Sequence, residues 1–213
     1  PEASLIDAIV FDLDGTLLNS LEDIASAMNR ILERDGLPTH GLAAYALFIG
    51  EGARHLVDAA LPTARRAETD VYLDRFRRLY RENLVIQTAP YAGIVELLET
   101  LTARGLPMAI LSNKPDEMTQ ILVKRFFAWR CVAGAREGEP KKPDPRAALP
   151  LLLALGAPAQ RVLMVGDTKT DMQTATRCGM RGIGVTWGFR QRPELEEHGA
   201  FAVIESADAL LDH

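Results

Sequence analysis

Two aspartates separated by one residue stand near the start of the chain. Asp12 and Asp14 follow the short apolar run of residues 8–11, and Gly15 and Thr16 come directly after them. A pair of carboxylates at the end of a buried strand can supply a nucleophile and a general acid/base beside a bound cation. Gly15 permits a sharp turn, and we expect Thr16 to offer its hydroxyl and amide to a bound anion. The run predicts acid/base chemistry on an anionic substrate, although such a run also occurs in ordinary loops.

A calcium loop is another interpretation of Asp12 and Asp14, and its register does not fit. An EF-hand loop carries a Gly at its sixth position and a bidentate Glu at its twelfth. Counted from Asp12, the glycine falls at the fourth position and the twelfth residue is Asp23. We therefore keep the catalytic interpretation.

Ser112 and Asn113 form a second candidate group, directly after the apolar run of residues 108–111. A hydroxyl and an amide at the end of a strand can hydrogen-bond phosphoryl oxygens without adding charge. The alternative is that Ser112 caps the helix that begins near Asp116.

Two adjacent lysines, Lys141 and Lys142, form a third group, followed by Asp144 between two prolines. The prolines fix the backbone, and a lysine held there is a fixed positive charge for a phosphate or a carboxylate. An exposed basic turn is the alternative. The spacing does not decide which lysine points inward, and we expect Lys142 because it abuts Pro143.

Asp167 and Asp171 form the fourth group, after the apolar run of residues 162–165. Carboxylates there can complete a magnesium site or hold the lysine, and the alternative is a helix cap. Each group has a purely structural explanation by itself. Together they supply a nucleophile, an acid/base, neutral donors, a lysine and metal-binding acids, which is the set that phosphoryl transfer requires.

The elements that must position these groups alternate between strands and helices. Continuous apolar runs, typical of strands buried on both faces of a parallel sheet, occur at residues 8–11, 108–111, 162–165, 183–186 and 201–204. Helical periodicity follows Ile94 and Met118. We expect an α/β fold with a doubly wound, Rossmann-like parallel sheet, whose sites lie at the carboxyl ends of the strands.

Residues 17–88 break this alternation. They show no convincing strand and only helical periodicity, with Ser20 as an expected N-cap. We expect an inserted all-helical cap over residues 17–88 and a discontinuous core formed by residues 1–16 and 89–213. Pro150 falls inside the helix expected after Arg146, so that helix is kinked or starts late.

Composition limits the class of protein. The chain has 213 residues, 47% hydrophobic residues and a formal net charge of -5, which fits one large domain with an insertion and argues against a nucleic-acid partner. Two cysteines, Cys131 and Cys178, make no disulfide framework. We find no run of 18 apolar residues and no signal-peptide pattern, so we expect a soluble, cytoplasmic protein with no membrane partner. The sequence does not indicate an oligomeric state.

With these groups in view, the chain resembles the haloacid dehalogenase superfamily, whose four motifs occur in this order and which has a helical cap of this first (C1) type. Within it, the chain is most similar to the phosphoglycolate phosphatase group in residues 12–20, 49–57, 90–93 and 185–188. Asn19 and Ala92 depart from the usual pattern of that group, which weakens the assignment to one named substrate.

The resemblance implies a mechanism. Asp12 would attack phosphorus and form an aspartyl-phosphate, while Asp14 would protonate the leaving alkoxide and then deprotonate the hydrolytic water. Ser112 and Lys142 would hold the phosphoryl group. The resemblance also implies a Mg²⁺ ion bound by the residues Asp12, Asp14 (through its backbone carbonyl) and Asp167, with Asp171 in a supporting role.

The resulting expectation is a Mg²⁺-dependent phosphatase of a small phosphate monoester, first of all 2-phosphoglycolate. Pyrophosphate, a nucleotide monophosphate or a sugar phosphate are alternative substrates, and a non-catalytic regulatory protein is an alternative class. Dehalogenases lack the acid equivalent to Asp14, and a phosphonate-cleaving relative needs a cap lysine, whereas no Lys precedes Lys114. In the cap, we expect Arg54 to bind the carboxylate of glycolate; the alternative is a solvated helix residue.

Overall fold

A six-stranded parallel sheet forms the centre of the computed structural model, which describes residues 6–127, 129 and 131–213. Its strands, in spatial order, are β5 (Val132–Ala135), β4 (Met108–Pro115), β1 (Ala8–Phe11), β6 (Val162–Gly166), β7 (Arg181–Val185) and β8 (Ala202–Ile204). The five predicted strands are present and pair in parallel, which confirms the α/β prediction. The edge strand β5 was not predicted, because its small residues form no continuous run of large apolar side chains.

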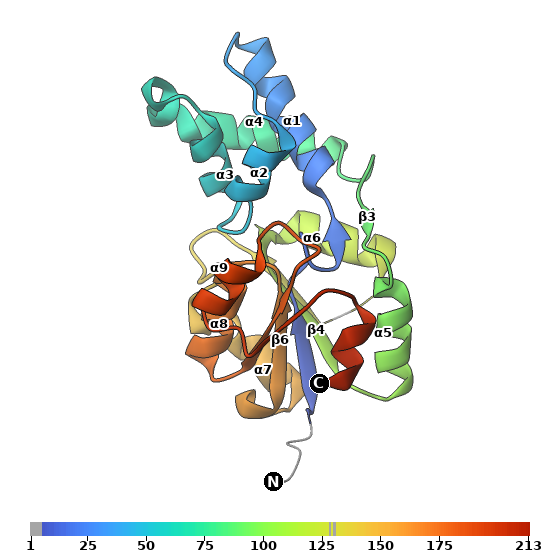
Figure 1. The fold of residues 1–213 in the computed structure, drawn as a ribbon. Coiled ribbons are helices and arrows are strands. Elements are labelled where there is room, and N and C mark those ends of the chain that lie inside the picture. The colour runs from blue at the N-terminus through green and yellow to red at the C-terminus, as the bar shows by residue number, and fades with distance from the viewer. Residues whose placement is uncertain (1–5, 128, 130) are drawn as a thin grey trace.

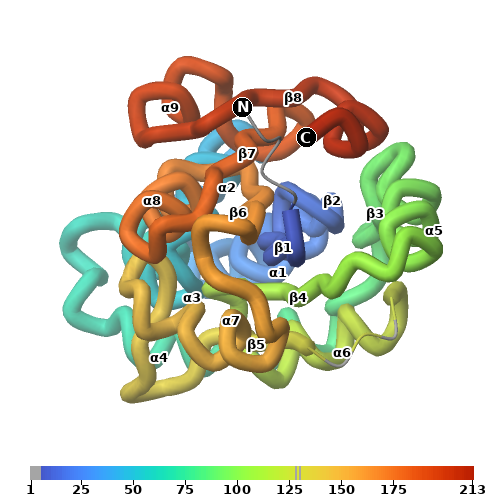
Figure 2. The backbone as a smooth tube through the Cα atoms, turned by 90° about the horizontal axis from the view of Figure 1, so that it is seen from below, coloured from blue at the N-terminus to red at the C-terminus, as the bar shows by residue number. Residues whose placement is uncertain are grey.

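Helices cover both faces of this sheet (Figure 2). Alternate residues of β1 point to opposite faces, so that Phe11 packs with helix α5 (Ile94–Ala103) and Val10 packs with helix α7 (Leu149–Leu155). Helix α6 (Asp116–Phe126) packs on β4 and β5, and helix α8 (Lys169–Cys178) packs on β6 and β7. Helix α9 (Arg192–Glu197) packs on β7 and β8.

The position of Pro150 determines where helix α7 can begin. A short 3-10 helix (Pro145–Ala147) comes first, and α7 starts at Leu149 with Pro150 in its first turn. A proline is tolerated there because its missing N–H would have no partner within the helix. Of the two predicted outcomes, the late start is therefore correct.

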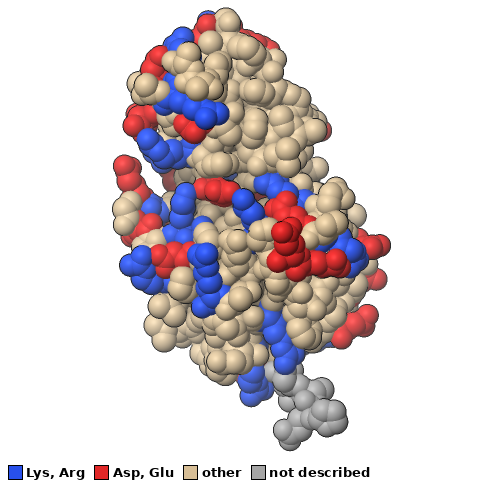
Figure 3. Space-filling model, turned by 60° about the vertical axis from the view of Figure 1, so that its left-hand side comes forward, with Lys and Arg blue, Asp and Glu red and all other residues tan. Residues whose placement is uncertain are grey.

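Four helices lie above the carboxyl edge of the sheet (Figure 1). They are α1 (Leu21–Arg34), α2 (Leu42–Phe48), α3 (Ala53–Ala60) and α4 (Thr69–Glu82), and we call them the cap. Met28 on α1 and Phe76 on α4 are buried in the same cluster, as the helical periodicity predicts. Figure 3 shows that acidic and basic side chains gather along the boundary between the cap and the sheet domain.

Two short linkers connect the cap to the sheet domain. Strand β2 (Leu18–Asn19) pairs antiparallel with strand β3 (Ala89–Pro90) at the point where the chain enters and leaves the cap. The prediction that residues 17–88 contain no strand is wrong at β2, because two residues are too few to show a pattern. The buried Asp23 carboxylate, in the first turn of α1, also accepts the backbone N–H groups of residues 86–88 and so holds the start of α1 against the segment that leads into β3.

Among the described residues, no helix combines the length and the hydrophobicity that a membrane crossing needs.

Candidate active site

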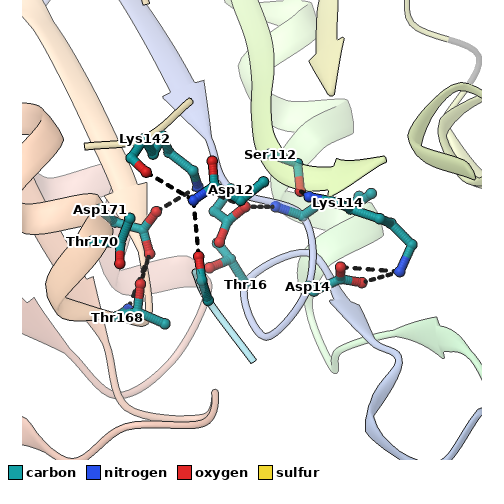
Figure 4. Close-up of polar contacts among 12 residues, drawn as sticks. Asp12, Asp14, Thr16, Ser112, Lys114, Lys142, Thr168, Thr170 and Asp171 are labelled. Carbon is teal, nitrogen blue, oxygen red and sulfur yellow. Dashed lines mark hydrogen bonds and ion pairs between the residues drawn. The ribbon is translucent and has the colours of Figure 1, made fainter. Parts of the chain in front are cut away.

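The four predicted groups meet at the carboxyl edge of the sheet, because adjacent parallel strands end there together. Asp12 follows β1, Ser112 lies near the end of β4, and Asp167 follows β6. Figure 4 shows Lys142 between Asp12 and Asp171, with Asp14 and Lys114 paired on the other side of Asp12. The groups therefore do not lie apart as separate turns, although the helix-cap alternative also holds for Asp171, which forms a capping box with Thr168 at the start of α8.

The Asp12 carboxylate has one oxygen occupied and one available. The Leu13 N–H donates to Oδ1 at 2.7 Å. The Lys142 Nζ lies 2.9 Å from the same oxygen. Oδ2 has no hydrogen-bond partner among the residues that the structure describes, so it is the oxygen left to face a reactant, and Asp12 also lines the cavity between the cap and the sheet. A nucleophile needs this combination of a fixed orientation and a free electron pair.

Lys142 is the lysine that enters the site. Its side chain is almost fully buried, and its Nζ lies 2.6 Å from Asp171 Oδ1. Burial by itself would lower the pKa of Lys142, but the carboxylates of Asp12 and Asp171 hold that pKa above its ordinary value. Lys141 instead stays at the rim, where its Nζ donates to the Glu51 carbonyl oxygen at 2.6 Å. The choice between the two lysines, which spacing left open, is thus made by the fold.

Three buried carboxylates crowd together beside this lysine. Oxygens of Asp12, Asp167 and Asp171 all lie within 4.8 Å of one another. Burial and then repulsion by Asp171 raise the pKa of Asp12 to about 7, although Lys142 opposes the shift. Burial and then repulsion by Asp171 and Asp12 raise the pKa of Asp167 well above its usual range. Such a cluster is relieved by a divalent cation, whose preferred ligands are carboxylate oxygens.

Asp167 is held by neutral donors. The Phe189 N–H donates to Oδ2 at 2.7 Å, and the Thr16 hydroxyl donates to Oδ1 at 3.0 Å. These bonds orient the carboxylate but do not balance its charge, which suits a metal ligand. Gly15 has φ +86°, and a Cβ there would lie 2.3 Å from the Asp167 carboxylate. The turn after Asp14 therefore requires glycine for close approach as well as for its backbone angle.

Thr16 does not have the predicted role of binding the anion. Its hydroxyl donates to Asp167, its N–H donates to the Leu13 carbonyl oxygen at 3.3 Å, and its side chain is fully buried. Both donors are thus used within the protein. Thr16 is a positioning residue for Asp167, and sequence spacing could not show this because the two residues are far apart in the chain.

Asp14 also lines the cavity, and two donors fix its carboxylate. The Ser20 hydroxyl donates to Oδ1 at 2.5 Å, and the Lys114 Nζ donates to both oxygens at 3.0 Å. Ser20 occupies the N-cap position of α1, but its side chain makes no capping bond. The predicted N-cap position of Ser20 is confirmed, but its hydroxyl bonds to Asp14 and not to the N–H groups of the helix.

Ser112 and Asn113 differ in what they can offer to a substrate. Ser112 lines the cavity, with its Oγ accepting the Lys114 N–H at 3.2 Å. Asn113 Nδ2 donates to the Gly50 carbonyl oxygen at 3.0 Å and to the Lys142 carbonyl oxygen at 2.9 Å. With both amide hydrogens used, the Asn113 side chain has none for a phosphoryl oxygen. The structure corrects that prediction: Asn113 joins the cap loop to the Lys142 loop.

Arg54 lies outside the cavity. It pairs with Asp70 on α4, and its side chain is 60% exposed. It borders an outer groove beside the cavity rather than the cavity itself. The structure therefore does not bring Arg54 together with Asp12 and Lys142, and the expectation that it meets the substrate carboxylate loses its geometric basis.

Lys114 and Tyr80 are cavity residues that the sequence reasoning did not select. Lys114 lies two residues after Ser112 on β4, and alternate residues of a strand face the same side. That spacing is the signal that could have identified it. Tyr80, on α4 of the cap, accepts a hydrogen bond from the Lys114 Nζ at 2.6 Å. No sequence signal distinguishes Tyr80 from the other apolar and aromatic residues of its helix face.

Comparison with known proteins agrees with this geometry. A family model described as haloacid dehalogenase-like hydrolase matches residues 9–185. The chain belongs to this family. Among curated haloacid dehalogenase-like relatives, a phosphoglycolate phosphatase of Pseudomonas putida is 34% identical over 95% of this chain and 78% of its own length. Another, from Aquifex aeolicus, is 37% identical over 85% of each chain.

Solved structures of this family have the same architecture. A crystal structure from Lactobacillus delbrueckii subsp. bulgaricus has a TM-score of 0.90 at 30% identity and covers 97% of both chains. A predicted phosphoglycolate phosphatase from Haemophilus somnus has a TM-score of 0.87 at 28% identity, over 100% of this chain and 99% of its own. The predicted family and fold are confirmed, and the protein is a phosphoric monoester hydrolase of the haloacid dehalogenase type.

Proposed function

We propose that this phosphatase hydrolyses 2-phosphoglycolate to glycolate and phosphate through an aspartyl-phosphate on Asp12. Curated relatives named phosphoglycolate phosphatase, at 34% and 37% identity, support the choice of substrate. The observation that carries the mechanism is the environment of Asp12. Its Oδ1 is held by Leu13 and Lys142 and its Oδ2 is free, at the floor of a cavity that Asp14 also lines.

In the first step, Asp12 Oδ2 attacks phosphorus and the bond from phosphorus to the ester oxygen breaks. Asp14, which must carry a proton at this stage, gives that proton to the leaving glycolate oxygen and regains one in the second step. In the second step, Asp14 takes a proton from water, whose oxygen attacks phosphorus, and the Asp12 carboxylate leaves. Ser112 and Lys142 hold the phosphoryl oxygens, the hydroxyl by hydrogen bonding and the ammonium by charge.

The acidic cluster fits a divalent cation, which we propose to be Mg²⁺. Asp12 and Asp167 would hold it through their carboxylates and Asp14 through its backbone carbonyl. Asp171 would support the site indirectly, because one of its oxygens bonds to Lys142 and the other to Thr168. When bound, Mg²⁺ supplies positive charge that offsets the charge of the phosphoryl group and of the carboxylates.

We further propose that residues 17–88 form a separate cap domain that closes over the site. The paired linkers β2 and β3 support this division. Closure would exclude water while the leaving group is protonated.

A panel of phosphate esters, ranked by kcat/KM with and without Mg²⁺, tests the proposed substrate. It should contain 2-phosphoglycolate, pyrophosphate, nucleotide monophosphates, sugar phosphates and p-nitrophenyl phosphate. We expect Mg²⁺-dependent turnover with 2-phosphoglycolate first. A higher rank for a sugar phosphate would contradict the substrate but not the phosphatase. No turnover of any ester would favour a regulatory protein.

The variant Asp12→Asn tests the intermediate. It should abolish turnover of every ester, because a neutral amide does not attack phosphorus, and it should prevent labelling of the protein by a ³²P-labelled substrate. Asp208→Asn, an exposed aspartate near the C-terminus, is the matched control and should label as the parent does. Retained labelling in Asp12→Asn would exclude Asp12 as the nucleophile.

A further inference from the structure

Lys114 places a buried ammonium group inside the cavity. Its side chain is 2% exposed, although it extends from the end of β4 and not from the protein core. Its Nζ contacts both Asp14 oxygens at 3.0 Å and the Tyr80 hydroxyl at 2.6 Å. These three contacts use all three hydrogens of the ammonium group. A lysine is seldom buried to this degree unless it is paired, and here Asp14 is the charged partner.

The rest of the cavity has little to offer an anion. Among the described residues that line it, Lys114 is the one Lys or Arg side chain. The cap contributes the apolar side chains Ile24, Ile49, Leu56 and Phe76. A carboxylate placed against these four side chains would lose its hydration without gaining a partner, which is strongly unfavourable. A second anionic group on the substrate must therefore meet Lys114.

Lys114 also lies at the right separation from the phosphoryl group. Ser112 and Lys114 both line the cavity, and two residues of a strand span about 6.6 Å. A short ester held through its phosphoryl group at Ser112 would direct its other end toward Lys114. A two-carbon tail has the length for this, whereas a bulky tail would have to enter the apolar cap.

We propose that Lys114 binds the carboxylate of the substrate and thereby sets the specificity for a short ester with an anionic tail. On binding, this carboxylate takes one of the ammonium hydrogens that Asp14 holds in the free enzyme. Asp14 then has an oxygen available for the ester oxygen of the same substrate. Lys114 thus couples recognition of the tail to the placement of the acid/base. This inference rests on the proposed function, since it assumes that 2-phosphoglycolate is the substrate.

The experiment compares 2-phosphoglycolate with ethyl phosphate, which has the same chain length but no carboxylate. If a Lys114 variant acts by disturbing Asp14, kcat changes for both esters. If the variant instead loses its contact with the substrate carboxylate, KM rises for 2-phosphoglycolate alone. In Lys114→Met, we expect the ratio of kcat/KM between the two esters to fall by about 100-fold, as for a buried charge pair that loses one partner. Lys124→Met, an exposed lysine of α6, is the matched control and should keep the ratio.

Two further variants keep the test decisive. Lys114→Gln removes the charge but keeps an N–H donor for Asp14, so it should fold if Lys114→Met does not, and it should also lose the preference. Tyr80→Phe leaves the ammonium in place and should keep the preference. Inhibition by glycolate, which carries only the carboxylate, should disappear in both Lys114 variants.

Several results would overturn the proposal. An equal loss on both esters in the Lys114 variants would make Lys114 a positioning residue for Asp14 only. Loss of the preference in Arg54→Met, with retention in Lys114→Met, would restore Arg54 as the carboxylate ligand. If the parent enzyme hydrolyses ethyl phosphate as well as 2-phosphoglycolate, the proposed substrate itself is wrong and the inference falls with it.

Discussion

Asp12 and Asp14 have different environments although one residue separates them. Asp12 lies against the buried acids Asp167 and Asp171, and burial together with repulsion by Asp171 raises the pKa of Asp12 to about 7. Asp14 is instead held by the Ser20 hydroxyl and the Lys114 ammonium. Two carboxylates in unlike environments can take unlike roles in one reaction. Their neighbours therefore support a nucleophile at Asp12 and an acid/base at Asp14.

At this scale, Thr16 provides a test of the metal site. Its hydroxyl orients Asp167, and Thr16 is not among the described residues that line the cavity. Thr16→Val keeps the shape but removes the bond, so the Mg²⁺ concentration for half-maximal activity should rise by about 10–100-fold, as for other partners of metal ligands. The measurement is a Mg²⁺ titration of activity at saturating substrate.

Thr16→Ser is the matched variant, because it keeps the hydroxyl and loses only a methyl group. It should titrate nearly as the parent does. An unchanged Mg²⁺ requirement in Thr16→Val would mean that Asp167 needs no help from Thr16, or does not bind the metal.

At the scale of elements, side chains of the sheet domain hold the cap loop of residues 49–52. Asn113 donates to the Gly50 carbonyl oxygen at 3.0 Å, and Lys169 lies 3.1 Å from Glu51. Arg190, between β7 and α9, donates to the carbonyl oxygens of Ala46, Leu47 and Ile49. The last carbonyls of a helix have no partner within it, so these bonds stabilise the end of α2 in its position over the site.

Removal of the Arg190 contacts should loosen this part of the cap. In Arg190→Met, we expect amide hydrogen exchange in residues 42–52 to become about 10–100-fold faster, as for the loss of hydrogen bonds from a charged donor. Hydrogen exchange followed by mass spectrometry measures this. Arg192→Met is the matched control, because its salt bridges to Glu196 and Glu205 lie within the sheet domain. Equal exchange in both variants would show that Arg190 does not hold the cap.

For the whole molecule, the distribution of charge matters more than its sum. The net charge of -5 would repel an anionic substrate. Several of the acids behind that sum are Asp12, Asp14, Asp167 and Asp171, which belong to the site. An arriving phosphate ester would meet the positive charges of Lys142, Lys114 and a bound cation at short range, where they outweigh the distant charges that salt screens.

The acidic cluster predicts how stability depends on pH in the metal-free protein. The pKa of Asp12 is about 7 in the folded state, against about 3.9 for an unfolded aspartate. Between these values the unfolded chain releases a proton that the folded protein retains, so stability falls as pH rises from about 4 to about 7. Asp167 acts in the same direction.

Mg²⁺ should reverse this loss, because it binds the deprotonated carboxylates. We expect the Tm difference between Mg²⁺-loaded and chelator-treated protein to be larger at pH 8 than at pH 5. At free Mg²⁺ of 100 times its Kd, the gain is about 2.7 kcal/mol. In Asp12→Asn the pH dependence should weaken. An equal Tm difference at both pH values would argue against these acids as the metal site.

The sequence by itself predicted five of the six strands of the main sheet, and it placed polar residues at the strand ends where a site would lie. Buried parallel strands require continuous apolar runs, and a site at their carboxyl ends requires polar residues just after those runs. Asp12, Ser112 and Asp167 each follow such a run, so local pattern was enough to predict that they lie at the same edge of the sheet. The edge strand β5 and the two-residue strand β2 were not predicted, because neither contains a run of large apolar residues.

Only the tertiary structure decided which polar groups are already satisfied by other parts of the chain. Thr16 bonds to Asp167, 151 residues away, and Lys114 bonds to Asp14, 100 residues away. Those partners turn Thr16 inward and Lys114 into the cavity, while Asp70 keeps Arg54 outside. The type of a residue determines which bonds its side chain can make. Which of them it does make depends on the groups that folding brings within hydrogen-bonding distance, and local spacing carries no record of these.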